Sequence, residues 1–372
     1  MVDAQIHCVI DNGSYQLKSG FSGEEAPRYT LRSILGKSKI DELCVGHEKK
    51  NCMIGPEAIQ KVGLLDIDYP INNGIITNWD AMEKIWNYNF VSEMKISPEE
   101  HNVLLTESPF NDRKHRETTI EILFEKFNIP GLYLSSQNVL SSYAVGKSTS
   151  MSINVGHTST SFCPLYEGFL CREFVTHIPI AGLKVNETLL TMLINNGQCL
   201  QTKMQQQAIE QIKLEYCSIV TDNTSDVNVA EQHEFELPDK TVIKIGNERY
   251  KASEVLFNAS DFGMEGVMSF KEAFIMSIRK SDMDIRNELL RNVLFSGGTT
   301  LMKGFKERVD KEINDITNDF DCKKKVHCYP EALYTAWIGG SILTSLGNFE
   351  NLWFKKSEYK EHGACLVHSK CP

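Results

Sequence analysis

Short apolar runs that end at glycine-containing turns recur along the chain. They are Ile6 to Ile10 before Asp-Asn-Gly-Ser, Met151 to Val155 before Gly-His-Thr, and Asn292 to Phe295 before Ser-Gly-Gly-Thr-Thr. Runs of this length beside turn residues predict strands that enter tight turns. The first two are followed by another apolar stretch and a second glycine, Gly20 and Gly168. The pattern therefore predicts one hairpin used twice.

Longer segments carry apolar residues at positions i, i+3 and i+4 with polar residues between them, which predicts amphipathic helices. Together with the strands they predict an α/β fold. Residues 36–62 differ, because they are polar, lysine-rich and dotted with glycine around an apolar tip at residues 43–45. We interpret this stretch as a small projecting subdomain with a mobile loop. The predicted helices are Trp79 to Met94, Asp112 to Phe127, Gln137 to Val145, Leu183 to Asn195, Gln205 to Ile219 and Phe270 to Ser277.

The length of 372 residues exceeds the size at which a single core stops growing, so it predicts two lobes with a cleft between them. A net charge of −10 argues against direct nucleic-acid binding through bulk electrostatics. The 11 cysteines have no C-x-x-C spacing, which is typical of reduced thiols in a cytosolic or nuclear compartment. The first twenty residues lack the pattern of a signal peptide, and no apolar run approaches a membrane span.

The turn of the first hairpin carries groups suited to an anion. Gly13 lets the backbone approach a ligand, and successive N–H groups around Ser14 can hold an anion. Lys18 can fold back toward the same anion, and the Asp11 carboxylate suits a water-coordinated Mg²⁺. On its own, this tetrapeptide is also typical of an ordinary turn. The third turn, residues 297–299, offers bare backbone for a nucleoside, so the turns together indicate ATP in the interlobe cleft.

Several longer stretches carry a further signal: DNGS with Lys18, GFSGEEAPR (20–28), YPINNGIITNWDAMEKIW (69–86), SPEEHNVLLTESPFN (97–111), YEGF (166–169), LFSGGTTLMKG (294–304) and YTAWIGGSILTSL (334–346). Through these stretches, nearly the whole chain resembles the actin family. The resemblance implies two ribonuclease-H-like lobes around a nucleotide cleft, divided into four subdomains. Subdomain 1 would take residues 1–32, 70–144 and 335–372, subdomain 2 residues 33–69 with a mobile loop at about 38–52, subdomain 3 residues 145–180 and 267–334, and subdomain 4 residues 181–266.

The resemblance also implies roles for individual residues. ATP or ADP with Mg²⁺ would be the ligand, Asp11 would hold the water shell of the metal, and Gln137 would orient the attacking water. Gly13, Ser14 and Lys18 would hold the phosphates. The second phosphate loop and the nucleoside border would consist of Gly156, Gly182, Lys213, Gly297, Gly298 and Thr299.

The second phosphate loop departs from the actin pattern. Asn154 and His157 replace two expected aspartates, and Ser161 replaces a histidine that would relay the proton of the attacking water. Loss of such a group typically lowers a rate by about 10²- to 10⁴-fold, so we expect ATP hydrolysis to be weak or absent. His157 could become protonated and pair with the γ-phosphate. The favoured alternative is a solvent-facing loop histidine.

Further departures lie around the rest of the expected pocket. Tyr15 replaces a small glycine and could crowd the phosphates, and Glu210 stands where an arginine is expected. Leu214 and Leu333 replace charged residues at the nucleoside end. We therefore expect a pocket that keeps its backbone cradle but binds nucleotide loosely.

The resemblance implies an actin-like cytoskeletal protein of the cytoplasm, with a nuclear location left open. Its partners would be itself or actin-like subunits, and actin-binding proteins at an apolar groove. Two alternatives remain: a scaffold subunit of a larger complex that forms no filaments, and a working ATPase of the actin, sugar kinase and heat-shock chaperone superfamily. Ordinary packing is the alternative explanation of the groove residues, which are Tyr143, Phe169, Ile342, Leu343 and Leu346.

Overall fold

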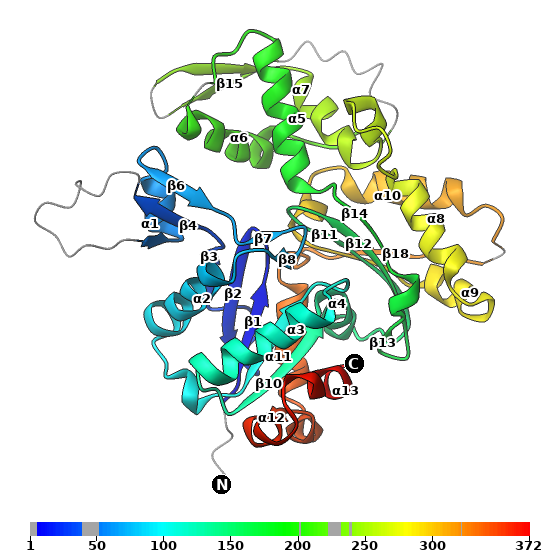
Figure 1. Ribbon diagram of the computed structural model, residues 1–372. Helices are drawn as coiled ribbons and strands as arrows, with labels where there is room; N and C mark the ends of the chain where they lie inside the picture. The colour runs from blue at the N-terminus through cyan, green and yellow to red at the C-terminus, as the bar shows by residue number, and fades with distance from the viewer. Residues whose placement is uncertain (1–5, 39–51, 201, 222–231, 238–239, 321) are drawn as a thin grey trace, which may run out of the picture.

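The protein folds into two α/β lobes, each built on its own mixed β-sheet, as the computed structural model shows (Figure 1). The structure describes residues 6–38, 52–200, 202–221, 232–237, 240–320 and 322–372. Helices and mixed sheets share the chain, so the predicted α/β class is confirmed. The expected apolar tip at 43–45 and residues 39–51 of the expected mobile loop lie outside the described residues.

The first sheet contains the first predicted hairpin. In sheet order it consists of β19 (Phe354–Lys355), β10 (Gly131–Ser136), β9 (Val103–Glu107), β1 (Cys8–Asn12), β2 (Gln16–Phe21) and β3 (Tyr29–Arg32). β1 is antiparallel to β2 and parallel to β9. Asp11 lies opposite Lys18 in the hairpin register. This register brings a carboxylate and an ammonium group together beside the turn.

The second sheet repeats this arrangement. It runs in the order β13 (Phe169–Leu170), β12 (Thr160–Tyr166), β11 (Ser150–Val155), β17 (Val293–Ser296) and β18 (Val326–Cys328), and β14 (Thr176–Ile178) also pairs with β12. β11 is antiparallel to β12 and parallel to β17. The prediction of one hairpin used twice is therefore confirmed.

Two helices cross where the lobes join. α4 (Gln137–Ala144) runs from β10 toward β11, and α11 (Thr335–Thr344) packs against it. Gly339 allows the close crossing, because a Cβ at this position would lie 1.8 Å from the Leu140 carbonyl oxygen. The buried indole N–H of Trp337 donates to the Val9 carbonyl oxygen at 2.9 Å and fixes α11 against β1.

Two helices beside the first sheet begin directly after residues whose side chains cap the helix N-terminus. Asn78 and Asp112 accept backbone hydrogen bonds at the N-termini of α2 (Trp79–Tyr88) and α3 (Arg113–Glu121). The predicted helices over 79–94 and 112–127 continue, but as π-helices at Asn89–Met94 and Ile122–Lys126. The C-terminal helices of this lobe are α12 (Lys356–His362) and α13 (Val367–Lys370).

The small projecting unit expected around residues 36–62 has its own sheet and core. Ile34, Ala58 and Leu65 form a separate buried cluster. A short hairpin follows it, made of β7 (Ile71–Asn72) and β8 (Ile75–Ile76). The elements of the unit are β4 (Leu35–Ser38), β5 (Cys52–Ile54), α1 (Pro56–Gln60) and β6 (Leu65–Asp68).

The predicted helices of the second lobe differ from the structure at their ends, whereas the helices Glu248–Lys251, Met283–Arg291 and Phe305–Ile316 are not among those predicted. α6 (Lys203–Tyr216) starts at the Thr202 capping box, two residues earlier than predicted. It ends before the predicted Ile219, because the amides of Ser218 and Ile219 donate to carbonyl oxygens outside the helix. The remaining elements are α5 (Gly182–Asn195), α7 (Glu248–Lys251), α8 (Phe270–Lys280), α9 (Met283–Arg291), α10 (Phe305–Ile316), β15 (His233–Glu236) and β16 (Val242–Ile245).

Short 3₁₀ helices connect several of these elements, at Pro98–Glu100, Arg172–Phe174, Ala252–Leu256, Ala259–Phe262, Gly298–Leu301, Gly347–Asn351 and Ala364–Leu366.

Candidate functional site

A cavity of about 870 Å³ lies between the lobes, at the turns of the two hairpins. Its volume is in the range of small-molecule sites. Most of the residues predicted from the sequence line it, whereas Ser161 and Gly182 do not. The lining residues among those predictions are Asp11, Gly13, Ser14, Lys18, Gln137, Asn154, Gly156, His157, Lys213, Gly297, Gly298 and Thr299.

Glycines give this cavity walls of bare backbone. A Cβ on Gly13 would lie 2.6 Å from the Gln16 carbonyl oxygen, inside the first hairpin. Gly297 has φ +95°, and a Cβ there would lie 2.3 Å from the Val155 carbonyl oxygen. Gly182 lies just behind the wall, where its carbonyl oxygen accepts a hydrogen bond from Lys213 Nζ at 3.2 Å. A side chain at the first two positions would distort the turns that shape the cavity.

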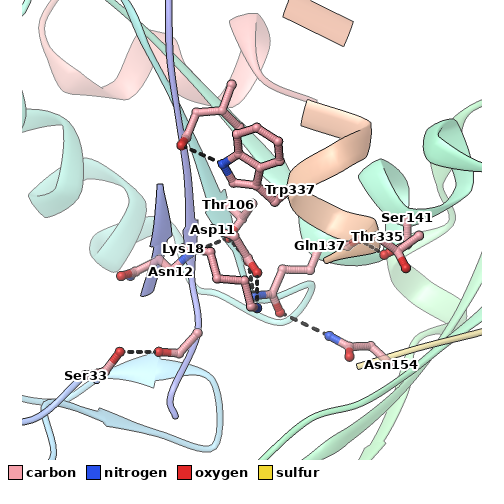
Figure 2. Close-up of polar contacts among 12 residues, drawn as sticks. Asp11, Asn12, Lys18, Ser33, Thr106, Gln137, Ser141, Asn154, Thr335 and Trp337 are labelled. Carbon is pink, nitrogen blue, oxygen red and sulfur yellow. Dashed lines mark hydrogen bonds and ion pairs between the residues drawn. The ribbon is translucent and has the colours of Figure 1, made fainter. Parts of the chain in front are cut away.

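Asp11 is the centre of a buried polar network on the floor of the cavity (Figure 2). Lys18 Nζ donates to Asp11 Oδ2 at 2.6 Å, and Thr106 Oγ1 and Gln137 Nε2 each donate to Oδ1 at 2.8 Å. Burial alone would raise the pKa of Asp11, but the charge and hydrogen bond of Lys18, with the two other donors, lower it below its usual value. Asp11 is therefore a carboxylate at neutral pH.

Gln137, the first residue of α4, joins the two hairpins. Its Nε2 donates to Asp11, and its Oε1 accepts from Asn154 Nδ2 at 3.1 Å, so both ends of its amide have partners (Figure 2). An aspartate at position 154 would offer no donor to Oε1. The departure at Asn154 thus changes what Gln137 can bind.

Ser161 does not line the cavity. Its Oγ donates to Asn138 Oδ1 at 3.1 Å, and Asn138 Nδ2 donates to the Ser152 carbonyl oxygen. The side chain therefore belongs to the buried packing between α4 and the second sheet. The expectation that Ser161 stands at the proton-relay position of the cavity is not supported by its contacts.

His157 is only partly exposed, so it differs from the freely solvent-facing loop histidine that the sequence favours. The imidazole packs against Tyr15, with ring centroids 4.9 Å apart, and lines the cavity. Burial and the positive charges of Lys213 and Arg32, against the opposing effect of Glu210, together lower the pKa of His157 to about 4. His157 is therefore neutral at pH 7 in this arrangement.

Tyr15 makes contacts that the sequence does not reveal. The Arg32 guanidinium lies over the Tyr15 ring at 3.6 Å from its centroid. Arg32 Nη1 also donates to Glu210 Oε2 on α6 at 2.9 Å. Ser14 Oγ and Thr158 Oγ1, in the turns of the two hairpins, are 3.1 Å apart and share a hydrogen bond. The two lobes therefore meet at the cavity through side chains as well as at the hinge.

The opposite end of the cavity is less polar than the family pattern predicts. Leu214 and Leu333 line it, and Leu214 is 71% exposed. Burial lowers the pKa of the nearby Lys213 ammonium. Thr299 Oγ1 donates to the Gly156 carbonyl oxygen at 2.7 Å and ties the third turn to the second hairpin.

The predicted apolar groove residues are largely exposed. Tyr143, Phe169, Ile342 and Leu346 are exposed, with Phe169 the most exposed of them at 64%. Leu343 is the exception, because it is buried in a core cluster with Trp337. Packing therefore accounts for Leu343 but not for the other four.

Other features bear on the class of protein. None of the helices in the described part of the chain is long and apolar enough to cross a membrane. The cysteines at described positions are all free thiols, as the sequence predicts. Within the described ranges, no cluster of three or more His, Cys, Asp or Glu side chains is suited to a metal ion.

The protein has two lobes with repeated hairpins, joined at crossing helices, and a glycine-walled cavity between them. This architecture defines a class of two-lobed α/β proteins with an interlobe cleft, a place where small-molecule sites commonly occur. Within this class, the family model for actin matches residues 2–372. The chain belongs to the actin family.

Proposed function

We propose that this protein binds ATP with Mg²⁺ in the interlobe cavity and acts as an actin-like cytoskeletal subunit through assembly and partner binding. The observation that carries the proposal is the glycine-walled cavity with the Asp11, Lys18 and Gln137 network on its floor, in a chain of the actin family. The proposal includes the four subdomains, with the boundaries given in the sequence analysis.

The residues present fit a nucleotide. Gly13, Ser14 and Lys18 would hold the β- and γ-phosphates, because bare backbone and an ammonium group meet there. Asp11 would hold the water shell of the metal, since Mg²⁺ usually keeps several waters and takes few protein carboxylates when phosphates are its ligands. The second phosphate loop would continue at Gly156, and the nucleoside would lie against Lys213, Gly297, Gly298 and Thr299, with Gly182 directly behind that wall. When bound, Mg²⁺ supplies charge neutralisation for the phosphates.

We propose further that ATP hydrolysis is weak or absent. Gln137 Oε1 already accepts a hydrogen bond from Asn154 Nδ2, so this oxygen is less available to orient a water. The second hairpin contributes no carboxylate at positions 154 and 157. His157, with its pKa lowered to about 4, is a weak base.

The test is the nucleotide carried by the purified protein, released by denaturation and measured over time with Mg²⁺. ATP that persists at one equivalent is the expected result. Lys18→Met should lose the nucleotide, whereas Lys184→Met, which removes an exposed lysine of α5, should keep it. Steady conversion to ADP would overturn the hydrolysis proposal, and a wild-type protein that stays empty in millimolar ATP would overturn the binding proposal.

Assembly and partner binding need a separate test. The exposed Tyr143, Phe169, Ile342 and Leu346 support a docking groove for actin-binding proteins. Sedimentation under polymerising salt should show self-assembly, alone or with actin-like subunits. Recovery from cells in fixed stoichiometry with non-actin subunits, without pelleting, would favour the scaffold alternative instead. Fractionation should place a cytoskeletal subunit in the cytoplasm, and a nuclear pool would favour the scaffold.

A further inference from the structure

A cluster of four side chains links the two lobes at the edge of the cavity. Tyr15 lies between the Arg32 guanidinium, at 3.6 Å from its ring centroid, and the His157 ring, at 4.9 Å between centroids. Arg32 Nη1 donates to Glu210 Oε2 at 2.9 Å. Tyr15 and Arg32 come from the β1, β2 and β3 part of the first lobe, whereas His157 and Glu210 come from the second hairpin and α6.

These contacts run from the cavity outward to the surface. Tyr15, His157 and Glu210 line the cavity, whereas Arg32 does not. The side chains of Arg32 and Glu210 are 23% and 22% exposed. The cluster therefore bridges the two lobes on one side of the cavity, and the lobes cannot separate there without breaking it.

The chemistry of the cluster favours a single arrangement. A guanidinium is planar, so Arg32 can stack on the Tyr15 ring and donate to Glu210 at the same time, which a lysine cannot do. Burial and the Glu210 carboxylate raise the pKa of Tyr15, so its phenol stays neutral. The neutral imidazole of His157 adds no charge that would repel Arg32.

We propose that Tyr15, Arg32, His157 and Glu210 form an interlobe latch that holds the cleft closed and limits the rate of ligand exchange. Opening of the lobes breaks the ring pair and the ion pair in one movement, because each has one partner in either lobe. The Ser14 and Thr158 hydrogen bond at 3.1 Å breaks in the same movement. That the ligand is ATP rests on the proposed function. That these four residues hold the cleft closed does not depend on the proposed function.

The latch predicts different kinetics from a simple electrostatic effect on an anionic ligand. Arg32→Ala removes a positive charge and Glu210→Gln removes a negative one, so electrostatics alone would shift ligand affinity in opposite directions. A latch predicts that both variants speed association and dissociation. For Arg32→Ala we expect about a tenfold increase in the dissociation rate, the size that one cation–π contact and one partly buried ion pair together support. For Glu210→Gln, which keeps the cation–π contact, we expect a smaller increase.

The experiment measures release of a fluorescent ATP analogue from the full-length protein by stopped flow. Glu187→Gln, which breaks the exposed Lys184 and Glu187 pair on α5, is the matched control and should leave the rate unchanged. The charge-exchanged Arg32→Glu/Glu210→Arg variant restores the ion pair without the stack on Tyr15 and should recover part of the slow release. Unchanged rates in both single variants, or affinity shifts of opposite sign without faster association, would overturn the latch.

Small-angle X-ray scattering of the nucleotide-free protein separates this inference from the proposed function. Arg32→Ala and Glu210→Gln should each have a larger radius of gyration than the wild type and the Glu187→Gln control, because their cleft opens. If the wild type binds no ATP analogue, the binding proposal fails while this measurement still decides the latch. An unchanged radius in both variants would contradict closure by these residues. Thermal melts of each variant check that it is folded.

Discussion

The two hairpins have the same backbone arrangement but different chemistry. In each, the first strand is antiparallel to the next and parallel to a third, and a glycine follows in the turn. The first hairpin carries a buried Asp11 and Lys18 pair, whereas the second carries Asn154 and a neutral His157. The comparison shows that glycines and strand register build the shape of the cavity, while the charge inside it can change independently.

The largest expected effect comes from restoring the charge of the second hairpin. In Asn154→Asp/His157→Asp, the new carboxylate cannot donate to Gln137 Oε1, which is then free to accept from a water. We expect ATP hydrolysis to rise by about 10²- to 10⁴-fold, measured as phosphate release from the ATP-loaded protein. Asn186→Asp, an extra carboxylate on α5 rather than in the second hairpin, is the control. If release is equally slow in the double variant, the difference between the hairpins does not explain the weak hydrolysis.

The first hairpin should respond to loss of its charge in stability as well as in nucleotide binding. Lys18→Met leaves the Asp11 carboxylate buried without its ion pair at 2.6 Å. Removal of one partner from a buried pair typically costs about 3–5 kcal/mol, which chemical denaturation can measure. Adding Asp11→Asn should recover part of this loss, since no buried charge remains. A loss under about 1 kcal/mol would mean that water reaches Asp11, since exposed pairs contribute this little.

The third turn, residues 297–299, can test whether the bare backbone that lines the cavity depends on glycine. In Gly297→Ala, the new Cβ would lie 2.3 Å from the Val155 carbonyl oxygen, in a backbone with φ +95°. We expect a loss of about 2–4 kcal/mol in unfolding free energy and weaker nucleotide retention. Gly347→Ala, where a Cβ meets nothing within 4 Å, is the matched control. Equal melting temperatures for the two variants would contradict a cradle that depends on glycine.

The sequence predicts the repeated hairpins well, because each strand is an apolar run beside a turn and needs no distant partner to be recognised. It also predicts that Asp11 and Lys18 belong to the same turn, but their ion pair follows only from the register of the hairpin, which places them opposite one another. Helix α10 was missed, although Phe305, Val309 and Ile313 recur at the i, i+4 spacing of a helix and are all buried. That signal was available in the sequence.

Side-chain directions at the site could not be predicted in the same way. Ser161 turns toward Asn138, and His157 turns toward Tyr15. Arg32 and Glu210 are 178 positions apart and meet only because the lobes close on each other. The alternation of apolar and polar residues along a strand predicts which face of the sheet a side chain lies on. Its contact partner in the other lobe depends on how the two lobes are positioned, and no local sequence pattern encodes that position.

The smallest expected effect is the pH dependence that His157 introduces into the second hairpin. Burial lowers the pKa of His157 from 6.5 to about 4, in a site that faces Tyr15, Arg32, Glu210 and Lys213. Between these two pKa values the unfolded chain binds a proton that the folded protein does not, so stability decreases as the pH falls from about 6.5 toward 4. Because His157 is partly exposed, we expect only about 1–2 kcal/mol of this loss between pH 7 and pH 4.5.

His157→Gln should remove that part of the pH dependence and leave the remainder, which arises from other groups such as the depressed pKa of Asp11. The measurement is the difference in unfolding free energy between wild type and variant at each pH. The difference should change between pH 6.5 and 4 and be constant above pH 7, because His157 is neutral in both states there. A constant difference at every pH would mean that His157 has an ordinary pKa, and the packing of its imidazole against Tyr15 would then not exclude water from it.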